Sequence, residues 1–187
     1  MEFDDVIKKS GESKKFSLKK PSPEKMTELI ITANHAPNPG NLHTLNYIVI
    51  DDPGIIAKIA DYCQQDFIQK APYIIIVCSN IKQAKKLYDK RAEKYVKHQV
   101  GFAVENILLK ATNDGLACSI TELFPEQILK DFLVISDNIE IELLLAIGYA
   151  YEKPKYSYKP SLVTRVFFNQ WGNRFYKPIR KLGREEY

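Results

Sequence analysis

The most regular feature of the chain is an apolar pattern between residues 100 and 111. Val100, Ala103, Val104, Ile107, Leu108 and Ala111 follow i, i+3, i+4, i+7 spacing without a miss. This spacing places side chains on one face of an α-helix. Asn113-Asp114-Gly115 follows the pattern, and a glycine there can close the helix in a left-handed conformation. A long helix with one buried face is therefore expected here.

Apolar runs and helix-start signals predict further elements on both sides of this helix. Ser22-Pro23-Glu24 combines an N-cap oxygen, a proline at the first helical position and an early acid, which predicts a helix that stops before Pro37. Tyr47–Ile50 and Tyr73–Cys78 are predicted to be buried strands. Additional helices are expected over 55–63, 80–99 and 125–132, and additional strands over 116–120 and 139–151, the last one central.

The bulk properties set modest limits. The 187 residues suit a single domain. No run of apolar residues is long enough to span a membrane, and the N-terminus lacks an apolar signal core, so a cytoplasmic protein is expected. Cys63, Cys78 and Cys118 are odd in number and widely spaced, which favours buried thiols over disulfides or a metal site. Residues 152–187, rich in aromatic and basic residues, are expected to form an extended C-terminal arm.

The segment from Ala36 to Ile50, with the sequence APNPGNLHTLNYIVI, is the most informative about function. It predicts a loop of Pro, Asn and Gly that runs from the end of a helix into a strand. The side-chain amides and open backbone groups of such a loop suit a planar ligand that forms hydrogen bonds.

Several motifs, in order, resemble those of the FMN-dependent nitroreductase family. Val6-Ile7-Lys8-Lys9-Ser10, followed by Lys14-Lys15-Phe16, is similar to the family's opening, in which Arg-Arg-Ser and a further Arg precede a Phe. The loop described above, the helix QVGFAVENILLKA from Gln99 and the segment GLACSITELF from Gly115 resemble the next three stretches. Ile147-Gly148-Tyr149 and Lys159-Pro160 are similar to the family's ending.

The resemblance implies an α+β, nitroreductase-like fold in which helices flank a mixed, mainly antiparallel sheet. It implies a homodimer with FMN at the subunit interface, and the helix from Val100 to Ala111 is the expected dimer core. The implied reaction is ping-pong: NADH or NADPH reduces FMN, and a nitroaromatic, quinone or similar small-molecule acceptor then takes the electrons. The flavin performs the chemistry, so no catalytic side chain and no metal is expected. No nucleic-acid or membrane partner is expected.

The resemblance also implies which residues bind the cofactor. A phosphate needs cations and hydroxyls from separate segments. The expected phosphate ligands are Lys8, Lys9, Ser10 and Lys14 on one side and Lys159 on the other. Asn38, Asn41 and His43 are expected at the pyrimidine edge of the ring, with Pro37 beside them. The backbone of Ile120, Thr121, Glu122 and Leu123 is expected at the reactive edge, where an N–H group stabilises developing charge.

Departures from the family pattern leave alternatives open. Lys stands where the family has Arg, which removes the bidentate phosphate contact. Gly11-Glu12-Ser13 inserts two residues, so either Ser10 or Ser13 can be the phosphate hydroxyl. Ala117 and Leu123 replace common glycines, and crowding of the ring is one expected consequence. A dedicated metabolite reductase on the same fold, or a non-catalytic dimer without flavin, therefore remains an alternative to a nitroreductase.

Overall fold

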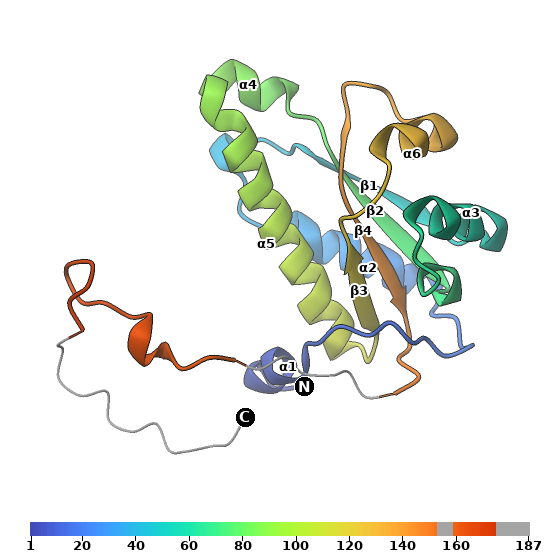
Figure 1. Cartoon of the computed structure of the whole chain (residues 1–187), viewed down its shortest axis with the longest axis horizontal. Coiled ribbons are helices and arrows are strands. Elements are labelled where there is room, and N and C mark those ends of the chain that lie inside the picture. Colours follow the sequence, from blue (N-terminus) through green and yellow to red (C-terminus); the bar gives the residue numbers. More distant parts are fainter. Residues whose placement is uncertain (153–158, 175–187) are drawn as a thin grey trace. The chain divides into compact units, whose positions relative to one another are not determined.

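The computed structural model describes residues 1–152 and 159–174 (Figure 1). The chain divides into two compact units, Met1–Lys155 and Tyr156–Tyr187. Within the described residues, no helix is long and apolar enough to cross a membrane.

The first unit is built on a four-stranded open sheet with the strand order β1-β2-β4-β3. The strands are β1 (Leu45–Ile50), β2 (Tyr73–Ser79), β3 (Ala117–Thr121) and β4 (Glu140–Gly148). Neighbouring strands pair antiparallel, and a parallel bridge joins Glu12 to Cys118 at the outer side of β3. The predicted α+β fold with a mainly antiparallel sheet is confirmed, and the run 139–151 contains a central strand as expected.

Helices occupy most of the remaining described residues of this unit. They are α1 (Phe3–Lys9), α2 (Pro23–Asn34), α3 (Pro53–Cys63), α4 (Lys82–Tyr88), α5 (Ala92–Asn113) and α6 (Glu126–Leu133), with 3-10 turns η1 (Pro39–Asn41), η2 (Ile68–Lys70) and η3 (Asp89–Arg91). The helix expected over 80–99 is divided at Asp89, which adopts φ of +46°. Its last part joins the helix expected from Val100, and together they form the 22-residue α5.

The short helix α1 was not predicted from the sequence. Its first turn carries Asp4 and Asp5, and its last turn carries Lys8 and Lys9. These charges complement the helix dipole at both ends, because the N-terminus is partially positive and the C-terminus partially negative. Val6 is the buried residue of α1.

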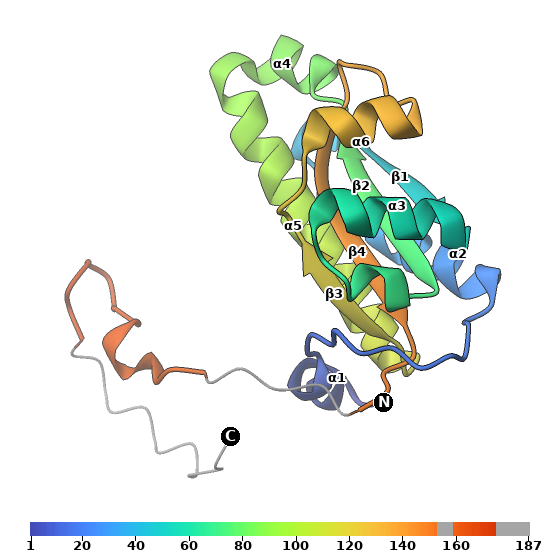
Figure 2. The same cartoon turned by 45° about the vertical axis from the view of Figure 1, so that its right-hand side comes forward.

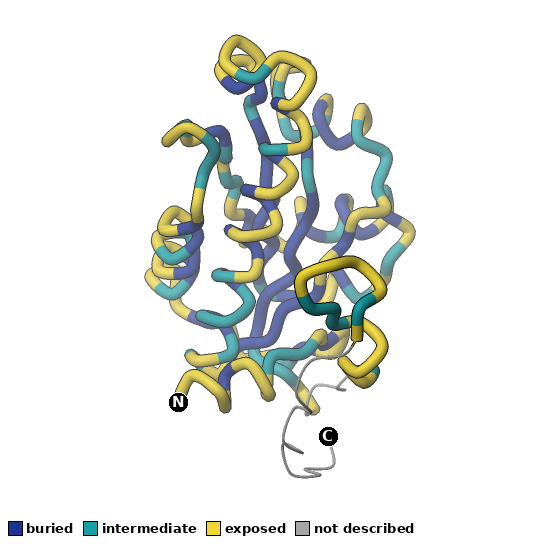
Figure 3. Tube along the Cα trace, turned by 90° about the vertical axis from the view of Figure 1, so that its left-hand side faces the viewer, coloured by how far each residue is buried: buried dark blue, intermediate teal, exposed yellow. Residues whose placement is uncertain are grey.

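The helices cover both faces of the sheet. In Figures 1 and 2, α2 and α5 lie on one face, and α3 and α6 lie on the other. Alternate residues of β2 supply the two cores: Ile75 and Val77 pack in the α2–α5 core, and Ile74 and Ile76 pack in the α3–α6 core. This alternation follows from the two-residue period of a strand, and Figure 3 shows the strands buried at the centre.

The apolar face of α5 is buried inside the protomer. Val100, Ala103, Val104, Ile107 and Ala111 are at most 6% exposed and belong to the core between α2, α5 and the sheet. This face therefore packs inside the protomer, and the expectation that the helix forms the dimer core stays a prediction for its other faces. The apolar side chain that α5 presents to solvent is Phe102, which is 50% exposed.

A β-bulge interrupts the pairing of the two central strands. Val77 pairs with Leu143 and Cys78 pairs with Ile141, so Glu142 has no residue opposite it in β2. A bulge redirects the side chain of the extra residue. Here the carboxylate of Glu142 meets Lys97 of α5 and the hydroxyl of Ser79.

The second unit contains the described residues 159–174. They include the 3-10 turn η4 (Leu162–Thr164) and a ring contact between Phe167 and Trp171, whose centroids are 4.7 Å apart. The rest of the expected arm, residues 153–158 and 175–187, lies outside the described residues. A single domain that ends in an extended arm remains a prediction.

Candidate functional site

The Asn38 loop, residues 36–44, is the first part of the candidate site. Its turn is tight, because Gly40 and Asn41 both adopt φ of +57°. Glycine tolerates this conformation without strain, and asparagine adopts it more readily than most residues. Asn38 Nδ2 lies 3.1 Å from His43 Nδ1, so the two side chains expected at one edge of a ligand do meet.

The Asn38 loop is anchored to α5 by a buried hydrogen bond. Thr44 Oγ1 donates to Gln99 Oε1 at 2.7 Å, and both residues are at most 5% exposed. Gln99 also lines a cavity of about 230 Å³, together with Pro37, Asn38, Pro39, Tyr95, His98 and Phe102. The loop therefore presents its amide and imidazole groups beside an aromatic surface of α5.

The N-terminal segment Ser10–Lys14 is the second part. It runs beside β3: Ser13 N–H donates to the Cys118 carbonyl at 3.1 Å, and Ser119 Oγ donates to Glu12 Oε1 at 2.6 Å. Ser13 is buried, and its hydroxyl donates to the Lys15 carbonyl at 3.1 Å. Ser10 is only partly buried, so of the two serines it is the one with a hydroxyl that can reach a ligand.

The cations of this region differ in how they are engaged. Lys15 forms an ion pair with Glu152 at 3.1 Å, and Lys9 lies 4.0 Å from Asp5. Lys14 Nζ lies 5.0 Å from the centre of the Phe67 ring, a cation–π contact that leaves its charge without a carboxylate partner in the described structure. Lys8 is an exposed residue of α1. Lys14 is therefore well placed to receive an anion.

The loop that follows β3 is the third part. Within the described residues, no protein acceptor receives the N–H groups of Glu122 and Leu123. Neither residue has a positive φ, so an L-residue replaces the family's glycine at Leu123 without backbone strain. The Leu123 side chain is 77% exposed and projects away from the protein. The backbone geometry that glycine would allow is therefore not required here.

Sequence reasoning missed Gln65, which holds this loop. Gln65 Nε2 donates to the Leu123 carbonyl at 3.2 Å, and Thr121 Oγ1 donates to Gln65 Oε1 at 3.3 Å. A polar residue just after a helix of 11 residues looks like an ordinary surface residue in the sequence. No local pattern connects it to a loop that lies more than fifty positions further along the chain.

A larger cavity lies between α5 and the strands β3 and β4. Its volume is about 570 Å³, and its lining includes Lys97, Gly101, Val104, Glu105, Leu108, Ile120, Glu122 and Glu142. Ile120 and Glu122 therefore face α5 across a space that is wide enough for a planar ring.

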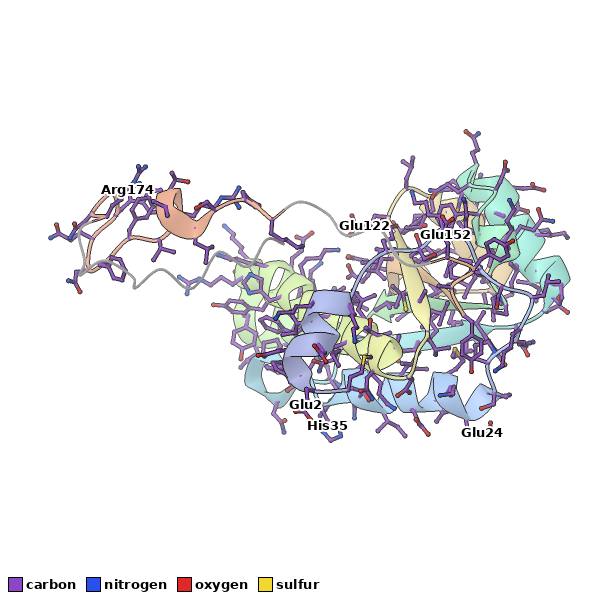
Figure 4. All side chains as sticks on the ribbon, turned by 90° about the horizontal axis from the view of Figure 1, so that it is seen from below. Glu2, Glu24, His35, Glu122, Glu152 and Arg174 are labelled. Carbon is purple, nitrogen blue, oxygen red and sulfur yellow. The ribbon has the colours of Figure 1, made fainter. Side chains whose placement is uncertain are left out.

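The Asn38 loop and the Glu122 loop lie on different sides of α5. The 570 Å³ cavity uses Lys97, Gly101 and Leu108, whereas the 230 Å³ cavity uses Tyr95, His98 and Phe102. At 100° per residue these two sets occupy different sides of a helix. His35 closes α2 just before the Asn38 loop. In the view of Figure 4, Glu122 and His35 appear on opposite sides of α5. Within one protomer the N-terminal segment lies beside β3, but the Asn38 loop does not lie beside the Glu122 loop.

Lys159 belongs to the second unit and is exposed. Its position relative to the other predicted ligands is therefore a prediction. Among the described residues, no group of three or more His, Cys, Asp or Glu side chains is arranged to hold a metal ion.

The three cysteine thiols are buried and weakly reactive. Burial raises the pKa of Cys63 and Cys78 to about 11 and the pKa of Cys118 to about 12. A thiol with such a pKa is protonated at neutral pH and is a poor nucleophile. The expectation of buried thiols is confirmed.

The fold and this arrangement define an α+β protein with an open, mainly antiparallel sheet covered by helices on both faces. The sequence model of the Nitroreductase family matches residues 59–149. This match and the fold make the chain similar to proteins of the nitroreductase family.

Known proteins of this family share sequence or fold with the chain. An NADH dehydrogenase/NAD(P)H nitroreductase of Archaeoglobus fulgidus is 26% identical over 133 residues, which cover 68% of this chain and 74% of that protein. A nitroreductase family protein of Clostridium novyi is 26% identical, with a TM-score of 0.73 over 92% of this chain and 96% of that one. The NADPH:FMN oxidoreductase of Vibrio harveyi has a TM-score of 0.81 at 15% identity, over 90% and 77% of the two chains, and so shares the fold.

Proposed function

We propose that the chain is an FMN-dependent NAD(P)H oxidoreductase of the nitroreductase type. The observation that supports this most directly is the position of the basic N-terminal segment beside β3. The segment that carries Ser10 and Lys14 thereby lies beside the same edge strand, β3, that leads into the loop with the open N–H groups of Glu122 and Leu123. The names of relatives in Archaeoglobus fulgidus and Vibrio harveyi, which refer to NAD(P)H, nitroreductase activity and FMN, agree with this proposal.

The chemistry of these donors fits FMN. A phosphate requires positive charge and hydroxyl donors, and Lys8, Lys9, Lys14 and Ser10 provide both. The reactive edge of the ring requires hydrogen-bond donors, and the backbone at Glu122 and Leu123 provides them. Glu12 adds a negative charge to the same segment, which opposes phosphate binding. Its Oε1 atom accepts a hydrogen bond from Ser119.

A second copy of the chain completes the proposed site. Pro37, Asn38, Asn41 and His43 lie on another side of α5 from the Glu122 loop, so one protomer presents two half-sites. A two-fold symmetric dimer would bring the Asn38 loop of each copy to the Glu122 loop of the other. We therefore propose a homodimer with two equivalent cofactor sites.

Bound FMN would supply the two-electron chemistry, taking electrons from NADH or NADPH and giving them to an acceptor such as a nitroaromatic or a quinone. The residues of the chain bind and orient. Lys14 and its neighbours hold the phosphate, and Asn38 and His43 hold the pyrimidine edge. The N–H groups of Glu122 and Leu123 stabilise negative charge at the reactive edge. Donor and acceptor use the same open face in turn, which is the basis of a ping-pong order.

An absorption spectrum tests the proposal. The purified chain is mixed with FMN, freed of excess FMN and examined for the visible absorption of a bound flavin. A retained flavin band that NADH or NADPH bleaches is the expected result. A chain that retains no flavin contradicts the proposal and favours the non-catalytic dimer.

A screen of acceptors then separates the two enzymatic alternatives. Similar, low rates with many nitroaromatics and quinones support a general nitroreductase. A steep preference for one acceptor supports a dedicated metabolite reductase on the same fold.

A further inference from the structure

The loop after β3 is held by one side chain from a distant part of the chain. Gln65 Nε2 donates to the Leu123 carbonyl at 3.2 Å, and Gln65 Oε1 accepts from Thr121 Oγ1 at 3.3 Å. Both functional atoms of the amide are therefore used on residues that flank Glu122. The two contacts restrain the loop on either side of its exposed peptide groups.

The position of Gln65 is itself fixed by the end of α3. Gln64 adopts the left-handed conformation with φ of +53°, and Gln65 N–H donates to the Ala60 carbonyl at 3.1 Å. This 6→1 bond is typical of a Schellman C-cap. The backbone from which the Gln65 side chain extends is thus part of a closed helix end rather than a free loop.

The contacts of Gln65 determine which backbone groups of the loop remain open. The Leu123 carbonyl is occupied by the Gln65 amide, while the N–H groups of Glu122 and Leu123 meet no protein acceptor in the described structure. Thr121 is 4% exposed, and its hydroxyl bond to Gln65 is partly buried. The donors thus belong to a loop whose orientation is fixed before any ligand arrives, which is the condition for electrostatic preorganisation.

We propose that Gln65 is a positioning residue that aims the N–H groups of Glu122 and Leu123 at the reactive edge of the flavin. This inference rests on the proposed FMN site. Gln65 acts through the loop and not by touching the reacting atoms. Its loss would leave the phosphate contacts of Lys14 intact and would misalign the donors that stabilise negative charge on the ring.

The first experiment uses the FMN-loaded protein and four variants. Gln65→Ala removes both bonds, Thr121→Val removes one with little change of shape, and Thr121→Ser keeps the hydroxyl. Gln69→Ala is the matched control, because Gln69 is an exposed glutamine of η2 whose side chain makes no hydrogen bond within the described structure. The measurements are the reduction of bound FMN against a reference dye, the dissociation constant of FMN, and kcat and KM for the acceptor.

For Gln65→Ala we expect the equilibrium constant for reduction of bound FMN to fall about fivefold, the effect of roughly one hydrogen bond. Thr121→Val should give a smaller fall, and Thr121→Ser should restore the wild-type value. kcat should fall with the reduction constant, while the FMN dissociation constant changes less than about twofold. Unchanged reduction of bound FMN in Gln65→Ala would overturn the inference.

A second experiment uses the flavin-free chain and does not depend on cofactor binding. Glutamyl endopeptidase cleaves after Glu122, and mass spectrometry identifies that product. Cleavage there should be several-fold faster in Gln65→Ala than in the wild type or in Gln69→Ala, because the loop has lost its restraint. Equal cleavage rates would show that Gln65 does not hold the loop and would overturn the inference.

The two experiments distinguish this inference from the proposed function. A wild-type chain that binds no FMN overturns the proposed function, and the flavin-positioning role of Gln65 falls with it even if the loop is restrained. A wild-type chain that binds FMN and is reduced by NAD(P)H, with variants that behave like the wild type, overturns the role of Gln65 alone.

Discussion

Lys97 of α5 donates a hydrogen bond of 2.6 Å to Glu142 Oε2, at the bulge between the two central strands. The other carboxylate oxygen accepts from Ser79 Oγ at 2.6 Å, and the Glu142 side chain is only 3% exposed. Both residues also line the 570 Å³ cavity. The pair thus connects the wall formed by α5 to the wall formed by the sheet.

Removal of Lys97 should destabilise the fold. Lys97→Met leaves a buried carboxylate with only the Ser79 hydroxyl as partner, and we expect a loss of about 1–2 kcal/mol in the free energy of unfolding. This value is below that of a fully buried pair, because the Lys97 side chain is 50% exposed. Denaturation by urea measures it.

Glu142→Gln provides the matched control for that prediction. The amide can still bond to Ser79, and Lys97 retains Glu140 at 3.6 Å. The cost should therefore be smaller than that of Lys97→Met. Burial is the largest single influence on Lys97 and lowers its pKa, but the hydrogen bonds and negative charges of Glu142 and Glu140 together outweigh burial, so the pKa of Lys97 is raised. An equal loss in the two variants would indicate that the buried charge is not the cause.

The sequence predicted the elements of the fold better than the connections between them. The run 139–151 reads as a strand because it is apolar, but the bulge at Glu142 depends on Lys97 and Ser79, which lie far away in sequence. Gln65 gives no local signal for the same reason. The helix at Val100 was predicted correctly from its periodicity, whereas the identity of the surface that covers it could not be read from the chain. An apolar stripe has the same pattern whether it packs on its own sheet or on a partner.

Lys14 and Lys15 should differ in their effect on FMN binding. Lys14 has no carboxylate partner in the described structure and contacts the Phe67 ring, whereas Lys15 forms an ion pair with Glu152 at 3.1 Å. If Lys14 binds the phosphate, Lys14→Ala should weaken FMN binding about tenfold, the effect of one charged contact. Lys15→Ala should change it less than about twofold.

Flavin fluorescence titration measures both dissociation constants. Lys14→Arg should retain or improve the affinity, because a guanidinium can form a bidentate contact with phosphate. Equal losses for Lys14→Ala and Lys15→Ala would point to a diffuse basic surface and not to a phosphate site.

The buried thiols make the fold sensitive to alkaline pH. Burial raises the pKa of Cys63 and Cys78 to about 11 and that of Cys118 to about 12, from an ordinary value near 9. Because each pKa is higher in the folded state, the stability that depends on the neutral thiols is complete below pH 9 and is lost as the pH rises through 11 to 12.

Thiol titration gives the corresponding measurement. At pH 8 the native chain should react slowly with Ellman's reagent, and all three cysteines should react after unfolding. Substitution of Cys118 by Ala should reduce the loss of stability between pH 9 and pH 12. Rapid reaction of a native thiol at pH 8 would contradict the burial assigned to it.

Gly40 and Gly101 should respond in opposite directions to substitution by alanine. Gly40 has φ of +57°, and a Cβ there would collide with the hydroxyl of Tyr88. Gly40→Ala should therefore cost about 1–3 kcal/mol and disturb the Asn38 loop. A Cβ at Gly101 meets nothing within 4 Å, and Gly101→Ala in α5 should stabilise the protomer by about 0.5–1 kcal/mol.

Thermal unfolding of both variants tests this contrast, with Tyr88→Ala combined with Gly40→Ala to separate the collision from the backbone strain. Removal of the Tyr88 ring should recover only part of the loss. If Gly101→Ala is instead destabilising and shifts the chain toward monomer in gel filtration, Gly101 lies in a close contact between two copies of α5.

Complementation between subunits provides the test of a site shared by two copies. One variant carries Lys8→Glu and Lys14→Glu, and the other carries Asn38→Ala and His43→Ala. Each variant alone should bind FMN poorly, since every site in its homodimer lacks one half.

A mixed dimer contains one site with both defects and one site with neither, because the two halves of each site come from different copies. After unfolding and refolding of an equal mixture, half of the dimers are mixed, so about one quarter of all sites should be intact. Flavin fluorescence of the desalted mixture measures this fraction. If both halves of the site came from one protomer, mixing would restore no flavin binding at all, because every protomer would still carry its own defect.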